Sequence, residues 1–459
     1  MNVAQSSILI RDFRAGLTGR AIAPGDPGYD EMRVVFPGGV DRRPSIIVLP
    51  KTDDDVRQTI TRVRDAGGEL AIRSGGHTIH GTTDGGVVLD LREMSALDVD
   101  VVAGTAWAQT GLTAAAYSTA VGAHGLATGF GDTGSVGIGG ITLGGGIGYL
   151  TRKHGLTIDS VLAAEIVTAD GELRRIDSAS EPDLFWAIRG GGGNFGVATR
   201  FKYRLQPVDR ILGGMLLLPA TPDVVAGFVA AAEAAPEELS TIANVMPAPP
   251  MPFIAPEHHG QIVVLALMCY AGDADVGARV LAPFRRLAAP VADMLRPMAY
   301  HEIYPPEDAS YHPTAVGKTM FIDRVDHGCA RTIVDAINAS DATLRVVQIR
   351  VLGGAMARVA PEATAFAHRQ RHILINVAAF FNGEADRSLR QSWVDDVAGR
   401  LDQGVRGAYV NFLNDEGADR VRAAYPGSTG ERLRRIKARY DPDNFFRRNE
   451  NIAPWSTQG

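Results

Sequence analysis

The chain has 459 residues, too many for one hydrophobic core, so we expect two or three domains. Its 45% hydrophobic and 21% charged residues are typical of a soluble globular protein, and a formal net charge of −6 without any basic tract argues against a nucleic-acid partner. The cysteines, Cys269 and Cys329, have no metal-type spacing, and no segment reaches the ~18 uncharged apolar residues that span a bilayer. We therefore expect a cytoplasmic protein with no metal site and no membrane partner.

The first part of the chain alternates short apolar runs with amphipathic stretches. Residues 45–50 are predicted to form a buried strand, residues 53–68 a helix that opens with aspartates and ends in glycines, and residues 70–76 a second strand. This order predicts a β-α-β unit. Further strands are predicted within residues 85–94 and, as a hairpin around the turn TADG, within residues 164–177.

A glycine-rich segment, residues 129–148, contains ten glycines among twenty residues. Glycine loses more conformational freedom on folding than any other residue, so we expect no helix or strand to be favoured here for its own sake. A cofactor lying against the backbone is the natural compensation, because glycine has no side chain to keep it away.

The composition changes at about residue 208. Alanine and proline become dense, and strand-like runs at residues 261–272, 345–354 and 372–381 are separated by helical segments. This pattern predicts a second domain built on an antiparallel sheet with helices, and an α+β fold class for the chain. The few charges near residues 247–256 favour a rather apolar ligand.

Two common phosphate-binding motifs fit the glycines poorly. A P-loop needs a glycine-rich run that ends in Gly-Lys, and none is present. A Rossmann fingerprint needs G-x-G-x-x-G between a strand and a helix with an acidic residue ~20 positions later, and residues 144–160 match it only loosely. A third interpretation takes the glycine segments together.

Four segments carry a resemblance to a known family. They are RSGGH at residues 73–77, the glycine-rich run at 134–156, PDLFWAIRGGGGNFGVATRF at 182–201, and YDPDNFFRRNENI at 440–452. In this order and at these separations they resemble the PCMH-type FAD-binding domain of the vanillyl-alcohol oxidase superfamily, and within it the berberine bridge enzyme-like branch.

The resemblance implies a two-domain α+β flavoprotein. Its FAD-binding domain would comprise residues 1–207, and an α+β substrate domain built on an antiparallel sheet would comprise residues 208–424. Residues 425–459 would return to the FAD-binding domain. The composition change at about residue 208 agrees in position with this division.

The same resemblance implies one covalent bond, from His77 to the 8α-methyl carbon of FAD. Such a bond needs a neutral, nucleophilic imidazole, and Gly75 and Gly76 leave room beside it. A loop histidine bonded to the backbone is the alternative. Family members with a second bond have a cysteine where this chain has Thr133, and a hydroxyl is far less nucleophilic than a thiolate, so we expect the single-link pattern. His80 is expected to be structural.

The remaining motif positions are implied to contact the cofactor. Backbone amides of the glycine-rich run, through Gly145 and its neighbours, would face the pyrophosphate and the ring, with a tight turn as the alternative at each position. The full expected cofactor-binding set is Arg73, Ser74, Gly75, Gly76, His77, Thr133, Val136, Gly137, Gly139, Gly140, Gly144, Gly146, Gly193, Asn194, Val197, Asn449 and Asn451.

Val136 bears on the electron acceptor. In this branch, valine or isoleucine at that position accompanies reaction with O2, whereas leucine blocks it, so the resemblance implies an oxidase that releases H2O2. Simple packing is the alternative role for Val136. Relatives carry a histidine where this chain has Ile141, and we expect the flavin to be tuned differently here.

The catalytic base is implied by the Y-x-N motif at residues 409–411. Tyr409 would be the base, with Asn411 as the motif's second polar group. A phenol has an unperturbed pKa of about 10, so a basic neighbour or the flavin must favour its ionised form. A packed tyrosine whose hydroxyl is bonded to the backbone is the alternative.

Strand alternation adds further candidates. Gln348 and Arg350 fall on one face of their strand, and so do His372, Leu374 and Asn376 of theirs. Related enzymes have a glutamate near the position of Gln348, and a glutamine there weakens any carboxylate-base mechanism. The expected catalytic set is Tyr409, Gln348 and Asn411.

Other functions stay open. A dehydrogenase with another electron acceptor and a flavin-binding protein without turnover would use the same fold, and an NAD enzyme is a more distant alternative. The expected partners are FAD, a small-molecule substrate and O2. Neither the substrate nor the oligomeric state follows from the sequence.

Overall fold

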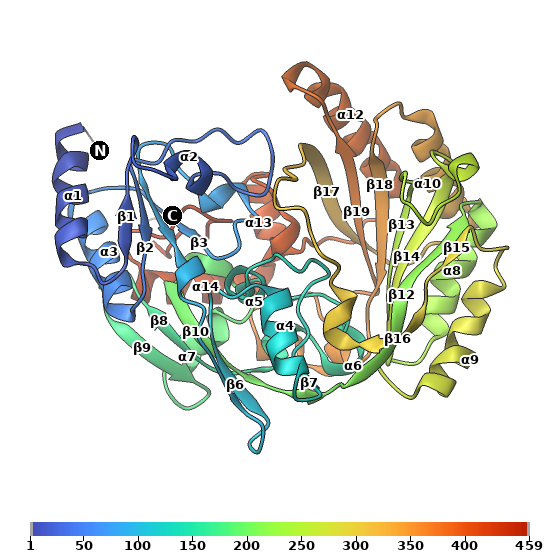
Figure 1. Ribbon diagram of the computed structural model, residues 1–459, viewed down its shortest axis with the longest axis horizontal. Coiled ribbons are helices and arrows are strands. Elements are labelled where there is room, and N and C mark those ends of the chain that lie inside the picture. Colours follow the sequence, from blue (N-terminus) through green and yellow to red (C-terminus); the bar gives the residue numbers. More distant parts are fainter. Residues whose placement is uncertain (1–2, 457–459) are drawn as a thin grey trace.

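The computed structural model describes residues 3–456, with side chains from residue 10 onward. Two α+β parts lie side by side (Figure 1). The chain begins in the part at the left of Figure 1, crosses to the part at the right with β12 (Arg210–Pro219), and returns at its end. Among the described helices, none is long and apolar enough to cross a lipid bilayer.

The N-terminal sheet is small and mostly parallel. Its order is β1-β2-β4-β3, with β2 and β3 both parallel to β4. Helix α3 begins after Thr52, which forms a capping box with Asp55. The predicted β-α-β unit is confirmed, with β4 between its two strands. The elements are α1 (Val3–Gly16), β1 (Arg20–Ile22), α2 (Tyr29–Met32), β2 (Ile46–Leu49), α3 (Asp53–Asp65), β3 (Leu70–Arg73) and β4 (Val87–Asp90).

A five-stranded antiparallel sheet follows, in the order β5-β6-β10-β8-β9. The hairpin predicted at residues 164–177 is confirmed as β8 and β9. The elements of this region are β5 (Leu97–Asp100), β6 (Thr105–Gln109), α4 (Ala114–Gly122), β7 (Leu126–Ala127), α5 (Ile138–Leu143), α6 (Thr151–His154), β8 (Val161–Val167), β9 (Leu173–Asp177), α7 (Pro182–Ala187), β10 (Val197–Arg204) and β11 (Gln206–Pro207).

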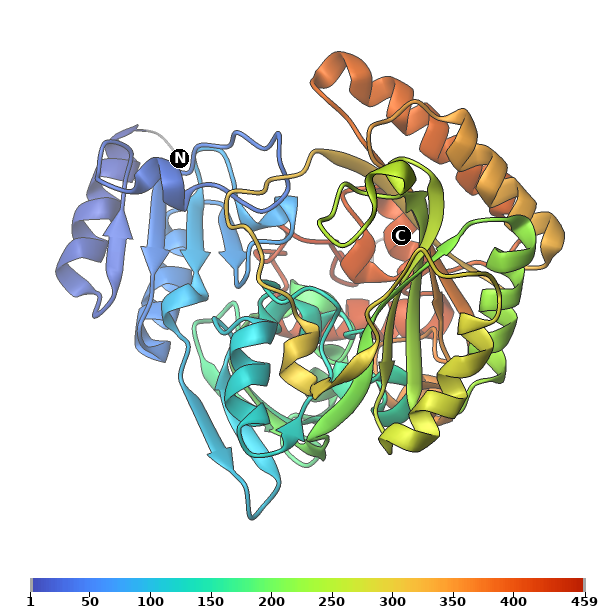
Figure 2. The same ribbon diagram turned by 45° about the vertical axis from the view of Figure 1, so that its right-hand side comes forward.

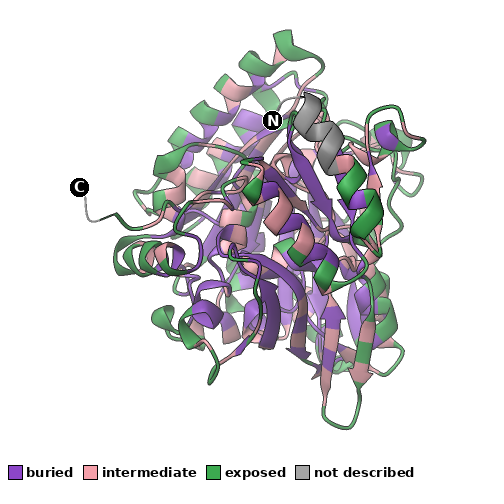
Figure 3. Ribbon diagram, turned by 90° about the vertical axis from the view of Figure 1, so that its left-hand side faces the viewer, coloured by how far each residue is buried: buried purple, intermediate pink, exposed green. Residues whose placement is uncertain are grey.

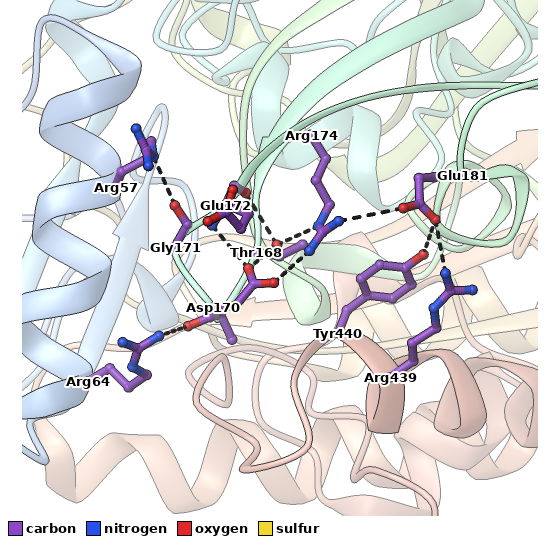
Figure 4. A network of polar contacts seen from close by, with 11 residues as sticks. Arg57, Arg64, Thr168, Asp170, Gly171, Glu172, Arg174, Glu181, Arg439 and Tyr440 are labelled. Carbon is purple, nitrogen blue, oxygen red and sulfur yellow. Dashed lines mark hydrogen bonds and ion pairs between the residues drawn. The ribbon is translucent and has the colours of Figure 1, made fainter.

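The turn of this hairpin is a junction between distant segments (Figure 4). Arg57 of α3 donates to the carbonyl oxygen of Gly171 at 3.0 Å, and Arg174 of β9 binds Asp170 at 2.6 Å. Arg174 also lies 3.6 Å from Glu181, which accepts a hydrogen bond from the hydroxyl of Tyr440. The end of the chain is thereby tied to both N-terminal sheets.

Helix α5 corrects one expectation, because it lies within the segment in which glycine content argued against a helix. Long-range contacts compensate for the glycines. The backbone N–H of Ile138 donates to Leu112, the carbonyl oxygen of Leu143 accepts from Gly190, and the hydroxyls of Thr142 and Tyr203 are 2.8 Å apart in the core. These contacts with distant segments stabilise the helix despite its glycines.

The second part is one large antiparallel sheet, in the order β15-β12-β14-β13-β18-β19-β17, with β16 also beside β12. Helices α8, α9, α10 and α12 cover one face (Figures 1 and 2), and the opposite face is turned toward the first part. The predicted second α+β domain is confirmed as a fold. Its elements are β12, α8 (Pro222–Ala234), β13 (Leu239–Pro247), β14 (Ile262–Tyr270), α9 (Ala274–Arg285), β15 (Ala292–Asp293), β16 (Arg296–Ala299), β17 (Ala315–Ile322), α10 (His327–Ala339), β18 (Arg345–Val351), α11 (Ala355–Arg358), β19 (Ile373–Phe380) and α12 (Glu384–Leu401).

Buried arginines join the two parts. Arg152 of α6 reaches across and donates to the carbonyl oxygens of Ala232 and Leu239 at 2.8 and 3.0 Å. In the opposite direction, the fully buried Arg369 forms two hydrogen bonds, of 2.7 and 2.8 Å, to the carboxylate of Asp159. Such pairs fix the mutual orientation of the parts, because separating them leaves buried charge unpaired.

The chain ends with α13 (Ala418–Ala424) and α14 (Gly427–Tyr440). Lys437 is fully buried; its ammonium group lies 2.5 Å from Asp441 and donates to the carbonyl oxygens of Asn194 and Phe446. In Figure 3, buried residues gather on the strands of the first part, and exposed residues gather on the helices at its surface. The contact with Asn194 holds the last helix against the first part, and the division into residues 1–207, 208–424 and 425–459 remains a proposal.

We predict that Lys437→Met lowers the free energy of unfolding by about 3–5 kcal/mol, because Asp441 would keep a buried charge without its cation. Arg435→Met, on the same helix, removes an exposed pair of 3.8 Å with Glu431 and should cost less than about 0.5 kcal/mol. Urea denaturation followed by tryptophan fluorescence measures both. Equal losses in the two variants would contradict the role given to Lys437.

Candidate functional site

The side chain of Arg73, at the end of β3, supports the loop that follows. This side chain is 1% exposed, and all three of its guanidinium nitrogens are hydrogen-bonded, to Asp90 and to the carbonyl oxygens of Val34 and Met32. Sequence reasoning made Arg73 a cofactor contact. The structure instead engages its side chain entirely within the protein, where it supports the loop.

His77 lies at the end of that loop, stacked on Phe36 with ring centroids 4.3 Å apart. Its Nε2 is 2.9 Å from the hydroxyl oxygen of Ser135, whose own hydroxyl is hydrogen-bonded to Glu307. Burial lowers the pKa of His77 below its usual value, and this outweighs the opposing effect of Glu307. The imidazole is therefore neutral at pH 7, as a nucleophile must be.

The two glycine loops press directly against each other. A Cβ atom added at Gly75 would lie 2.1 Å from the backbone nitrogen of Gly137, and one at Gly137 would lie 2.0 Å from the hydroxyl oxygen of Ser74. Gly139 is likewise close to Ser74 and Thr110. These glycines are required by contact between protein segments, a reason that the sequence alone did not suggest.

Other glycines of the motifs divide into two groups. Gly144 packs against Asn411, and Gly146 against Thr157, since an added Cβ would come within 1.9 Å of a side-chain oxygen in each case. Gly140 and Gly193 differ, because nothing lies within 4 Å of a Cβ added at either. Their α-carbons face open space, as expected where a ligand approaches the backbone.

The closing motif packs against the turn that contains Asn194. The amide group of Asn194 donates to Gly191 and to Glu450, and its oxygen accepts from the N–H of Ile452 at 2.9 Å. Asn194 thus joins two chain segments, which is the tight-turn alternative to a cofactor contact. Asn449 similarly donates to the carbonyl oxygen of Gly193 at 3.1 Å.

Several buried polar atoms near the closing motif have no hydrogen-bond partner among the described residues. They belong to residues of three separate segments: Thr82 Oγ1, Tyr425 Oη, Asn449 Oδ1 and Asn451 Oδ1. Buried polar groups are nearly always paired in native proteins, so we expect these atoms to bind a ligand or an ordered water. The two hydroxyl groups can donate to the phosphates of a dinucleotide cofactor, and the two amide oxygens can accept from its hydroxyl groups.

Three predicted contact positions are placed less directly. Val197 is 1% exposed and its side chain lies in the core of the N-terminal sheet, which leaves it no free surface for a ligand. Thr133 and Val136 are half-buried, and the carbonyl oxygen of Val136 accepts from Ala114 at 2.9 Å. His80, expected to be structural, is 3.2 Å from Glu450.

The hydroxyl of Tyr409 accepts three hydrogen bonds. The backbone N–H groups of Gly146 and Ile147 donate to it, each at 3.1 Å, and the side-chain amide of Asn411 donates at 3.0 Å. The second amide hydrogen of Asn411 goes to the carbonyl oxygen of Ile141, which fixes the orientation of the amide. Burial raises the pKa of Tyr409 above its usual value, although the three donors act in the opposite direction.

A polar row crosses the sheet face that is turned toward Tyr409. Gln348 of β18 stands opposite Asn376 of β19 and donates to Asn244 of β13 at 2.9 Å. Arg350, on the same face, donates to Gln348 at 2.9 Å and pairs with Asp132 of the first part at 2.8 Å. The predicted shared faces are confirmed by this register, whereas His372 is exposed just before β19. Asn244 was missed, although the alternation of its strand offered the signal.

Comparison with known proteins agrees with this geometry. Residues 44–177 match the family model of the FAD-binding domain, and residues 408–453 match the model described as berberine and berberine-like. The fold and these matches define an FAD-dependent oxidoreductase. More particularly, the two domain matches and these relatives confirm the resemblance to the berberine bridge enzyme-like branch of FAD-linked oxidoreductases that was inferred from the four motifs.

Individual relatives span nearly the whole chain. The (R)-6-hydroxynicotine oxidase of Paenarthrobacter nicotinovorans is 29% identical over 458 residues, covering 95% of this chain and 97% of that protein. An FAD-linked oxidoreductase of Dictyostelium discoideum is 28% identical over 424 residues, covering 90% and 89%. The crystal structure of 6-hydroxy-D-nicotine oxidase from Arthrobacter nicotinovorans superimposes with a TM-score of 0.86 at 25% identity, covering 96% of this chain and 99% of that one.

The contrast between the glycines can be measured in the flavin-free chain. We predict that Gly137→Ala lowers the free energy of unfolding by about 3 kcal/mol, because the added methyl group forces two backbone segments apart. Gly140→Ala, in a helix and facing open space, should instead raise it by ~0.5–1 kcal/mol. Chemical denaturation decides, and destabilisation by both changes to the same extent would refute the packing argument.

Proposed function

We propose that this protein is an oxidase that removes a hydride from a carbon bearing a hydroxyl or amine group in a small, fairly apolar natural-product-like molecule, and that O2 then takes the electrons and forms H2O2. The observation that carries this proposal is the threefold hydrogen bonding of the Tyr409 hydroxyl beside the glycine loop. The oxidase activity of the nicotine oxidase relative supports it.

The residues present fit FAD, which supplies the hydride acceptor when bound. The open space beside Gly140 and Gly193 leaves room for the cofactor. The unpaired side-chain oxygens of Asn449 and Asn451 can accept hydrogen bonds from its hydroxyl groups. We further propose a single covalent bond to His77, supported by the neutral state of that imidazole. Thr133 has no thiol with which to form a second bond.

A test of the covalent bond uses the denatured chain. We expect acid-denatured protein to show one band of flavin fluorescence under ultraviolet light after gel electrophoresis, and His77→Ala to show none while still binding FAD. His80→Ala is the matched control, since His80 lies on the same loop and pairs with Glu450. A wild-type band without fluorescence, from yellow protein, would refute the bond and leave the family assignment intact.

Tyr409 is proposed as the base that takes the proton from the substrate. Its oxygen receives three N–H groups, and no acceptor for its own hydrogen is found among the described residues. A phenolate, which only accepts, matches such a set of donors better than a phenol does. Arg350 also favours the ionised form, because its charge acts to lower the pKa of Tyr409.

Asn411 and Gln348 are proposed to act beside this base. Asn411 donates directly to the Tyr409 hydroxyl, so it stabilises the charge that the base carries. Gln348 is half-buried in the polar row and is suited to hydrogen-bond the substrate's oxygen or nitrogen. The surrounding face supplies Ile242, Leu267 and Leu374, which supports a ligand that is otherwise apolar.

Val136 is proposed to permit the approach of O2. The alternative is a dehydrogenase of the same fold that uses another acceptor, and a grass pollen allergen with glucose dehydrogenase activity shares this fold with a TM-score of 0.81 at 21% identity. Because that likeness concerns the fold alone, only turnover distinguishes the two. A protein that binds flavin without turnover would need no base.

We predict that kcat/KM rises about tenfold per pH unit between pH 7 and 9, because the raised pKa of Tyr409 keeps the ionised fraction small in this range. Tyr409→Phe should lower kcat at least about 100-fold while the bound flavin is retained. Oxygen uptake and peroxide release, measured with a substrate found by screening, provide the rates. Turnover without oxygen uptake would identify a dehydrogenase, and unchanged turnover in Tyr409→Phe would exclude this base.

A further inference from the structure

We propose that Glu307, acting through the hydroxyl of Ser135, positions His77 for the attachment of FAD. This inference rests on the covalent bond proposed above and adds two residues, Ser135 of the glycine-rich motif and Glu307, which lies outside all the motifs. Glu307 belongs to the second part of the molecule, 230 positions from His77 in the sequence. It would thus be a positioning residue that acts from across the interface.

The contacts form an unbroken chain. One carboxylate oxygen of Glu307 accepts from the backbone N–H groups of Gly134 and Ser135, at 2.7 and 3.0 Å. The other accepts from the hydroxyl of Ser135, and the oxygen of that hydroxyl lies 2.9 Å from Nε2 of His77. Three hydrogen bonds hold the carboxylate at this place, and the stack on Phe36 holds the imidazole.

This chain fixes which nitrogen of His77 carries the proton. A carboxylate only accepts hydrogen bonds, so the single hydrogen of the Ser135 hydroxyl is used on Glu307. The hydroxyl oxygen must then accept from His77, and Nε2 is the protonated nitrogen. Nδ1 keeps its lone pair free to attack.

The same chain receives the proton that the reaction releases. A bond forms between Nδ1 and the 8α carbon of FAD, that carbon loses one proton, and Nε2 loses the other to Ser135 and Glu307. The flavin ring takes up the two electrons and two protons, and O2 removes them as H2O2, which restores the oxidised ring. Without an acceptor at Nε2, the alkylated imidazole would carry a positive charge in a buried place, at a cost in energy.

Glu307 lies on a strap, residues 304–314, that crosses from the second part to the first (Figure 2, the yellow-orange segment reaching toward the blue region). Tyr304 anchors it at one end through the carbonyl oxygen of Gly131, at 3.1 Å. At the other end the carbonyl oxygen of Pro313 accepts from Gly38 at 2.8 Å. Attachment of FAD would therefore require that the two parts have already docked.

The experiment follows attachment directly. Flavin-free protein from riboflavin-starved cells is mixed with FAD under air, and the covalently bound fraction is read over time by in-gel fluorescence. We expect Glu307→Gln to slow attachment about 100-fold, because a glutamine amide donates to Ser135, turns the hydroxyl toward Nε2 and so moves the imidazole proton to Nδ1. Asp308→Asn is the control, a neighbouring carboxylate on the same strap whose hydrogen bonds, among the described residues, go to Ser310.

A second readout reports the tautomer without any flavin. Long-range 15N–1H correlation spectra of histidine-labelled protein, assigned with His77→Ala, should show the proton on Nε2 in wild type and Asp308→Asn, and on Nδ1 in Glu307→Gln. Ser135→Ala should also attach FAD slowly, and Ser135→Thr, which restores a hydroxyl, should recover most of the rate. This rescue separates positioning from a general loss of structure.

The outcomes are distinct. Attachment at the wild-type rate in Glu307→Gln, with the wild-type tautomer, would overturn the proposal and leave the covalent bond standing. Wild-type protein that binds FAD but never links it would overturn both. If Glu307→Gln fails to bind FAD, Ser135→Ala decides: slow attachment with rescue by threonine supports the chain of contacts, and an unchanged rate refutes it.

Discussion

The close contact between the backbones of Gly75 and Gly137 is the constraint on which the site depends. A Cβ atom at either position would collide with the other loop, so the two segments can meet only as glycines. Their contact brings His77 within hydrogen-bond distance of Ser135 and sets helix α5 beside the loop of Arg73. The glycine motifs therefore build the frame of the site from protein contacts, and only at a few positions, such as Gly140, leave space for a ligand.

The second constraint is the competition at the hydroxyl of Tyr409. Burial without water disfavours a phenolate, whereas two backbone N–H groups, the amide of Asn411 and the charge of Arg350 favour it. Burial outweighs the other effects in the protein alone and raises the pKa of Tyr409, so the resting base is protonated. The same donors are fixed in place before any proton moves, and fixed dipoles of this kind stabilise a charge without reorganisation when it develops. One arrangement thus accounts for both a stable resting state and a reactive one.

Local pattern was sufficient for much of the fold and for the motifs. Strands such as β2, β14 and β18 are apolar runs with turn residues at both ends, and the hairpin of β8 and β9 follows from its TADG turn. The glycine-rich segment misled, because its helix α5 is stabilised by Leu112, Gly190 and Tyr203, which are distant in sequence. Site residues that act through contacts across the interface could not be predicted from the sequence either. Nothing in the sequence around Glu307 marks it. The alternation of its strand could have marked Asn244 but does not reveal its partner Gln348, because that contact exists only once the sheets have assumed their register.

The interface between the two parts determines more than their orientation. Arg152, Arg369 and Arg350 each lie at this boundary, the first bonded to carbonyl oxygens and the other two paired with carboxylates of the opposite part. Arg350 at once stabilises the interface through Asp132 and lowers the cost of an ionised Tyr409. Glu307 likewise anchors its strap on Gly134 and orients His77 through Ser135. Arg350 and Glu307 thus both hold the parts together and prepare the site, so a competent site requires a docked molecule.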